Sequence, residues 1–232
     1  MPAKNSQKLY SANGFYHIYN RGVEKRDIFV DDLDYGVFLS YLKEYLLPKD
    51  TKALCDILSN PIAPYDAKKE AAKLLRMNNF SDEITLLAYI LMPNHFHFLV
   101  HQNSPNAIDS FMNSMATRYT MYFNRKEERV GPLYQSVYKA VLMKTDEQLL
   151  HVSRYIHRNS VGLASKGHPF KGSPFTIQPS SYPEYLGLRK TEWVHPEQIL
   201  SFFSANNKHL SYKSFVDIDE ISESIQDYLL DE

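Results

Sequence analysis

The stretch from Leu91 to Val100, Leu-Met-Pro-Asn-His-Phe-His-Phe-Leu-Val, constrains the fold of this chain more than any other. Its aromatic and β-branched residues favour a buried β-strand, and Pro93 must lie at or before the strand's first residue because proline cannot donate to a sheet ladder. Side chains at i and i+2 share one face, so His95 and His97 lie side by side with Cα atoms about 6.5–7 Å apart. Two imidazoles at that spacing can bind one cation. The alternative is structural, with one histidine in the core and the other at a strand end.

The composition is typical of a globular protein. The chain has 232 residues, of which 44% are hydrophobic and 23% charged. This length suits one domain with insertions, or about one and a half domains. No run reaches the roughly 18 apolar residues of a membrane span, and the polar N-terminus does not have the pattern of a signal peptide. The single cysteine, Cys55, excludes an intramolecular disulfide and is typical of a reducing cytoplasm.

Charge is distributed unevenly along the chain. The net charge is −1, but residues 215–232 hold seven carboxylates and no Lys or Arg, so the remaining chain carries about +6. A mildly basic body permits binding to nucleic acid but does not demonstrate it.

Hydrophobic periodicity predicts an alternating order of strands and helices. The expected elements are a strand at 14–22, a helix at 35–46 capped by Asp31 or Asp32, strands at 84–91 and up to 100, a helix at 106–124, a strand at 137–143 and a helix from Thr145 or Asp146 to about Gly162. The first six form the β-α-β-β-α-β order of a ferredoxin-like sandwich with a central antiparallel sheet. The fold class is therefore α+β, with an extra C-terminal helix as the seventh element.

Two segments are additional to this core. Residues 48–82 are expected to form an insertion, interrupted by Pro61 and Pro64, with a Lys-rich helix over 67–77. We expect a main domain at 1–190 that includes this insertion. A helical extension with an acidic tail follows at 191–232, with an irregular stretch at 167–183 and short helical patterns at 196–203 and 218–230.

The extra helix carries Arg-Tyr-Ile-His-Arg-Asn from Arg154 to Asn159. Tyr155 and Asn159 are spaced i,i+4 and therefore lie on one face, where the phenol and the amide oxygen can act together. The chain has 17 tyrosines, so a packing role for Tyr155 is the alternative. His157 and Arg158 point to other sides of the helix, and we expect them to be solvated.

These motifs together resemble a known family, the single-tyrosine HUH transposases, and in particular the REP-associated tyrosine transposases. The resemblance spans about residues 14 to 187 and is carried by Tyr16–Gly22, Asp27–Phe29, Leu91–Val100, Tyr122–Asn124, Gly131–Gln135, Tyr138–Lys139 and Arg154–Val161. It implies that His95, His97 and Asn159 bind a divalent metal and that Tyr155 attacks a DNA phosphate. The implied activity is metal-dependent nicking and strand transfer of single-stranded DNA through a 5′-phosphotyrosine, at hairpin or REP-like sequences.

The expected cofactor is Mg²⁺ or Mn²⁺, because two imidazoles with amide and phosphate oxygens suit these ions. No Gly-rich phosphate loop is present, so no nucleotide cofactor is expected. The expected partner is hairpin-containing single-stranded DNA, with no membrane, and the protein is expected to be a monomer or homodimer in the cytoplasm, associated with the nucleoid. Side chains that could contact phosphates are Arg21, Arg118, Lys139, Arg154 and Arg158, for each of which ordinary solvation is the alternative.

Two rival functions remain open from the sequence. The first is a DNA-binding regulator that retains the pocket of such an enzyme but has lost turnover. The second is a small-molecule metallohydrolase built on His-x-His, which predicts a third metal-binding His or Asp and no covalent DNA adduct.

Overall fold

A four-stranded antiparallel sheet forms the centre of the computed structural model, which describes residues 10–165 and 179–217 apart from the side chains of 160–165. Its strands are β1 (Gly14–Arg21), β2 (Ile84–Met92), β3 (His95–Gln102) and β4 (Lys139–Met143), in the order β2-β3-β1-β4. The two-residue link Pro93–Asn94 returns β3 antiparallel to β2, as predicted. β4 begins two residues later than expected. This order of strands and helices confirms the predicted α+β fold with a central antiparallel sheet.

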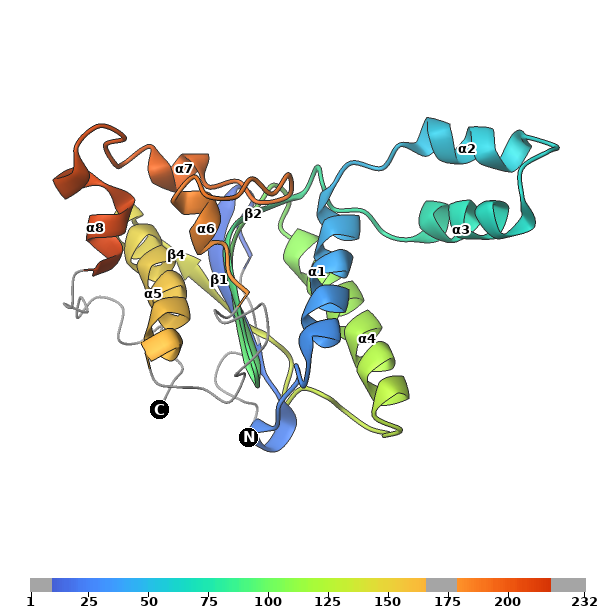
Figure 1. Ribbon diagram of the computed structural model, residues 1–232, viewed down its shortest axis with the longest axis horizontal. Coiled ribbons are helices and arrows are strands. Elements are labelled where there is room, and N and C mark those ends of the chain that lie inside the picture. The colour runs from blue at the N-terminus through green and yellow to red at the C-terminus, as the bar shows by residue number, and fades with distance from the viewer. Residues whose placement is uncertain (1–9, 166–178, 218–232) are drawn as a thin grey trace.

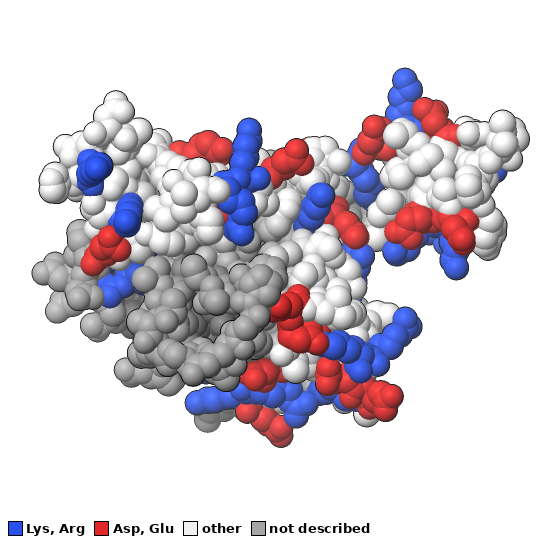
Figure 2. Space-filling view, viewed as in Figure 1, with Lys and Arg blue, Asp and Glu red and all other residues white. Residues whose placement is uncertain are grey.

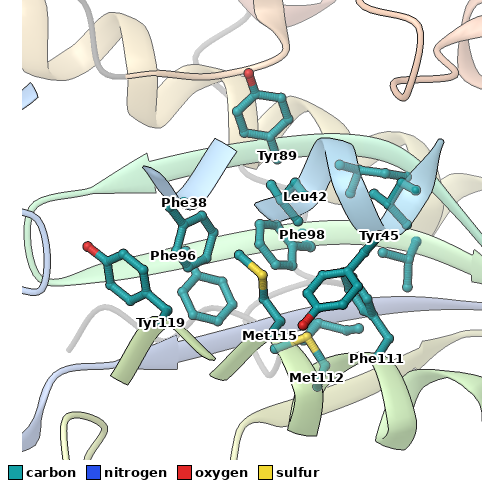
Figure 3. Close-up of a cluster of buried hydrophobic side chains, with 14 of the residues drawn as sticks. Phe38, Leu42, Tyr45, Tyr89, Phe96, Phe98, Phe111, Met112, Met115 and Tyr119 are labelled. Carbon is teal, nitrogen blue, oxygen red and sulfur yellow. The ribbon is translucent and has the colours of Figure 1, made fainter. Parts of the chain in front are cut away.

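One face of the sheet is covered by α1 (Asp32–Leu46) and α4 (Ala107–Lys126), which lie together on the right of the sheet in Figure 1. Helix α1 begins directly after Asp31, one of the two predicted caps, whose side chain accepts a hydrogen bond of 3.0 Å from the Asp34 backbone N–H. The interface is largely aromatic, with Phe38, Phe96 and Phe98 in mutual contact (Figure 3). This cluster is the larger of the two apolar clusters among the described residues.

The opposite face of the sheet carries α5 (Asp146–Ser165), the predicted seventh element. Thr145 Oγ1 accepts a hydrogen bond of 3.2 Å from the Gln148 backbone N–H, so Thr145 caps the helix. The buried side chains of Leu149, Val152 and Ile156 attach α5 to β2, β3 and β4. The spacing of these residues, i, i+3 and i+7, is the helical stripe that the sequence predicts.

The 48–82 insertion forms a helical hairpin that projects away from the sheet (Figure 1). It consists of α2 (Thr51–Ser59) and α3 (Tyr65–Arg76), and the expected Lys-rich helix corresponds to α3. Helix α2 was missed, although its apolar residues at 54, 57 and 58 have helical spacing. Figure 2 shows Lys and Arg interspersed with Asp and Glu over the hairpin, so no charge of one sign dominates the side in view.

The segment after α5 packs on the outside of that helix. It contains α6 (Tyr182–Tyr185), α7 (Glu197–Leu200), the 3-10 turn Lys208–Leu210 and α8 (Tyr212–Asp217). Tyr185, Ile199 and Tyr212 join the same apolar cluster as α5, so both sides of the predicted 190/191 boundary share one core. The predicted helix at 196–203 is reduced to α7, and the one at 218–230 lies outside the described residues. A second short 3-10 turn, Val23–Lys25, follows β1.

No helix in the described part of the chain is long and apolar enough to cross a membrane.

Candidate active site

His95 and His97 lie next to each other on the α5 side of β3. Their ring centroids are 5.1 Å apart and the rings are nearly perpendicular. Both are buried, with 6% of His95 and none of His97 exposed. β3 is a central strand, so neighbours on β1 and β2 enclose the pair from both sides. The same-face placement predicted from the i,i+2 spacing is the placement that the structure has.

The surroundings of this pair keep His97 neutral. Burial lowers the pKa of His97 well below 6.5, and nearby His17, His95 and Arg21 lower it further. The Nε2 atom of His97 is buried and has no hydrogen-bond partner among the described residues. A neutral imidazole with an unsatisfied ring nitrogen is the form that binds a metal ion.

The orientation of His95 is set by the residue before it. His95 Nδ1 lies 2.5 Å from Asn94 Oδ1. Because an amide oxygen only accepts hydrogen bonds, this contact places the proton of a neutral His95 on Nδ1. The lone pair is then on Nε2, the ring atom suited to bind a cation.

Helix α5 places Tyr155 against the histidines. The ring of Tyr155 meets that of His97 edge to face, with centroids 5.3 Å apart and an interplanar angle of 88°. Tyr155 is half-buried and lies at the margin of the apolar stripe that attaches α5 to the sheet. A residue 58 positions later in the chain is thus brought directly to the His-x-His pair.

Asn159 lies one helical turn after Tyr155 and is half-buried. Its Nδ2 atom is buried without a hydrogen-bond partner among the described residues. The two amide atoms of an asparagine side chain can exchange places by rotation, so this position can present either a donor or an oxygen ligand.

The side chains of the site fit a divalent cation that is completed by other ligands. His97 provides an unsatisfied buried nitrogen, His95 an oriented lone pair, and Asn159 an amide. No group of three or more His, Cys, Asp or Glu side chains that could hold a metal ion occurs within the described ranges. The remaining ligands of a cation would therefore be water or substrate oxygens.

Two of the predicted basic residues border the histidines. In the sheet register Arg21 is opposite His95, and Tyr19 is opposite both His97 and Lys139. Residues paired across a sheet project to the same face, so Arg21 and Lys139 flank the pair. The Lys139 ammonium lies 5.6 Å from the centroid of the Tyr19 ring.

The other predicted basic residues are placed differently. Arg118 is on α4, which covers the opposite face of the sheet, and its guanidinium contacts Glu44 at 2.7 Å and the Tyr41 ring at 3.6 Å. Arg154 is only 4% exposed, and its guanidinium lies 4.9 Å from the centroid of the Phe215 ring. These positions argue against phosphate contacts by Arg118 or Arg154. Arg158 is half-buried on α5.

The expectation that His157 is solvated is wrong. His157 is fully buried, with Nδ1 2.6 Å from the Tyr212 hydroxyl and Nε2 2.8 Å from Ser181 Oγ. Burial lowers its pKa to about 3. His157 thus attaches α5 to the segment that follows it. The sequence contains no local signal for this contact, because the two partners lie 55 and 24 residues further along the chain.

A third histidine of the site, His17, was not singled out from the sequence. It is fully buried in β1, its Nε2 lies 2.9 Å from His97 Nδ1, and burial lowers its pKa to about 3. The alternation of His17 with Tyr19 shows that they share a face. Only the pairing of β1 with β3 shows that this face is that of His97.

Comparisons with known proteins bear on this geometry. Residues 58–159 match the family model for IS200-like transposases, a range that contains His95, His97, Tyr155 and Asn159. No curated protein matches the chain. The structure of a REP-associated tyrosine transposase bound to a REP hairpin is 11% identical with a TM-score of 0.48, and covers 83% of this chain and 97% of that one. A proposed transposase from Deinococcus radiodurans is 16% identical with a TM-score of 0.32, and covers 68% of this chain and 96% of that one.

Proposed function

We propose that this chain is an enzyme of the IS200-like transposase family, whose model its residues 58–159 match, and that it nicks and rejoins single-stranded DNA through a covalent bond to Tyr155. The observation that carries the proposal is the edge-to-face contact of Tyr155 with His97. It joins the tyrosine of the Arg154–Asn159 motif to the histidine pair, in a site bordered by Arg21 and Lys139.

The proposed chemical step is a transesterification. The phenolic oxygen of Tyr155 attacks a DNA phosphorus, the new bond is a 5′-phosphotyrosine ester, and the bond to the 3′ oxygen breaks. The phenol proton leaves to solvent and the departing 3′ oxygen takes up a proton. The ester conserves the energy of the broken bond, so a 3′-hydroxyl can reverse the step without a nucleotide cofactor.

Positive charge is needed at this step. A phenol in water has a pKa near 10, so forming a phenolate at pH 7 costs about 4 kcal/mol. Arg21 and Lys139 supply fixed positive charge beside the phosphate in the proposed complex. His95, His97 and Asn159 would hold a divalent cation, Mg²⁺ or Mn²⁺, which when bound stabilises negative charge on the phosphate and the leaving oxygen.

The proposed substrate is a single strand that contains a hairpin. This part of the proposal is supported by the sequence motifs shared with REP-associated tyrosine transposases. The modest positive charge outside the acidic tail also suits a substrate recognised by shape more than one held by charge alone. DNA as substrate would place the activity in the cytoplasm, at the nucleoid.

The test is detection of the covalent adduct. Labelled single-stranded oligonucleotides with and without hairpins are incubated with protein and Mn²⁺ and resolved on a denaturing gel. We expect a protein–DNA band for the parent and none for Tyr155→Phe, which retains the ring and its packing. Tyr134→Phe is a matched control, because the buried Tyr134 hydroxyl has no hydrogen-bond partner in the described residues and its loss should leave the adduct intact.

The same gel separates the rival functions. Hairpin binding by the parent without any adduct would indicate a regulator and overturn the proposed chemistry. An adduct that persists in Tyr155→Phe, or that maps to another tyrosine by mass spectrometry, would overturn the assignment of the nucleophile.

A further inference from the structure

His17 is a buried imidazole in direct contact with the cation site, and the chemistry proposed above does not use it. Its Nε2 lies 2.9 Å from His97 Nδ1, the two rings are within 18° of parallel, and their centroids are 5.1 Å apart. At that distance no ion fits between the two nitrogen atoms. His17 is therefore a hydrogen-bond partner of a ligand rather than a ligand itself.

The position of His17 is fixed on several sides. It lies in the middle of β1, opposite Leu99 on β3, and is fully buried. The centroid of the Tyr19 ring lies 5.0 Å from that of His17, and the centroid of the Tyr155 ring, which meets His17 edge to face, lies 6.2 Å away. A side chain enclosed in this way holds whatever it is hydrogen-bonded to in one orientation.

The hydrogen bond between the two imidazoles can have either of two directions. If His97 carries its proton on Nδ1, it donates to His17 Nε2, and the proton of His17 is on Nδ1. If His17 donates instead, the proton of His97 is on Nε2, where it blocks a cation. The two outer atoms, His17 Nδ1 and His97 Nε2, are both buried and have no hydrogen-bond partner in the described residues. Each arrangement therefore leaves one buried N–H unsatisfied, so the protein alone selects neither strongly.

We infer that His17 is a positioning residue for the cation site: its Nε2 accepts a hydrogen bond from the Nδ1–H of His97 and thereby presents the Nε2 lone pair of His97 to the divalent cation. This inference rests on the cation site of the proposed function. Metal-binding histidines are often held by a carboxylate that accepts their second N–H. Here the neutral imidazole of His17 takes that place, in an environment where an unpaired carboxylate would be costly to bury.

The first test compares Mn²⁺ affinities by calorimetry, with thermal melting of the same samples. His17→Phe keeps a ring of similar size but cannot accept a hydrogen bond, whereas the side-chain oxygen of His17→Gln can accept one and reaches about as far as Nε2. We expect His17→Phe to bind Mn²⁺ about 10–100-fold more weakly than the parent, and His17→Gln to regain most of the loss. His101→Gln, which removes a half-buried histidine further along β3, controls for the loss of an imidazole.

The outcomes separate this inference from the proposal beneath it. A folded His17→Phe protein that binds Mn²⁺ as tightly as the parent would overturn the role of His17 and leave the cation site standing. If His17→Phe and His17→Gln lose Mn²⁺ affinity equally, and each loss parallels a fall in melting temperature, His17 has a packing role. This result would also overturn the inference. A folded parent that binds no Mn²⁺ would remove the cation site, and this inference with it.

A second measurement does not depend on the variants folding. Nitrogen-15 NMR of the parent with Zn²⁺, a diamagnetic probe, reports which imidazole nitrogens carry protons. With the ion bound we expect protons on Nδ1 of both His97 and His17, with His17 Nε2 unprotonated. A proton on His17 Nε2 in the bound state would contradict the inference whatever the variants do.

Discussion

The two faces of β3 differ sharply although they are made by alternate residues of one short strand. Phe96, Phe98 and Val100 point toward α1 and α4 into the larger apolar cluster, as Figure 3 shows for the two phenylalanines. His95 and His97 point toward α5, where buried nitrogen atoms remain without hydrogen-bond partners in the described residues. The first face satisfies its side chains by packing, whereas the second leaves polar atoms available to a ligand. Adjacent residues of one strand can therefore serve stability on one face and chemistry on the other.

A cavity on the face of β3 that packs against α1 and α4, the packed face, should produce the largest change in the free energy of unfolding. Phe98 is fully buried and its ring contacts those of Phe38 and Phe96. We expect Phe98→Ala to lower the free energy of unfolding by about 3–5 kcal/mol, measured by urea denaturation. At a temperature where the variant is folded, adduct formation should be close to that of the parent. A folded variant with strongly reduced adduct formation would show that the two faces are not separable.

A substitution on the α5 side of β3 should lower the affinity for the cation and leave stability nearly unchanged. In His97→Asn the amide nitrogen reproduces the position of Nδ1 and can donate to His17, but the group at Nε2 is lost. We expect Mn²⁺ affinity to fall at least about 100-fold, or about 2.7 kcal/mol, because this change removes a ligand rather than its support. The unfolding free energy should change little. Retained Mn²⁺ affinity in calorimetry would remove His97 from the cation site.

Alkaline pH should act on the packed face through its tyrosines. Burial, reinforced by the Asp34 carboxylate, raises the pKa of Tyr119 far above 10, and its hydroxyl donates to the Ile28 carbonyl at 2.6 Å. Above pH 10 the unfolded chain therefore loses a proton that the folded chain keeps, so stability falls as pH rises, by about 1.4 kcal/mol per pH unit for each such group. Urea midpoints between pH 9 and 11 measure this slope. Tyr119→Phe should have a shallower slope, and an unchanged slope would contradict the assignment.

The smallest expected effect is on DNA binding, from a residue at the border of the face that carries His95 and His97. Lys139 flanks the histidines without being enclosed, so its contact with a phosphate would be partly screened by solvent. We expect Lys139→Ala to weaken single-strand binding only a few-fold and to reduce the salt dependence of log K by about 0.7. Arg118→Ala on the far side is the matched control and should leave both quantities unchanged. Equal effects from the two variants would indicate non-specific charge and not a site at this border.

The order of elements and the two faces of β3 followed from the sequence because they depend on local periodicity. Apolar residues at period 2 and at helical spacing indicated β1 to β4, α1, α4 and α5, and the His-x-His spacing placed both imidazoles on one side. The role of Tyr155 came from its resemblance to a family motif, not from any local pattern. The apolar residues of α2 in the insertion also have helical spacing, although that helix was not predicted.

Tertiary structure alone decided which side chains meet. The His17–His97 hydrogen bond depends on the register of β1 against β3, and the burial of His157 and Arg154 depends on the segment after α5 folding back over it. Neither can be read from local pattern, because hydrogen bonds and burial between distant segments are set by how the whole sheet and its helices pack. The sequence by itself determined the elements and which side of each is apolar. Packing then decided which of the remaining polar groups are enclosed as partners and which face the candidate site.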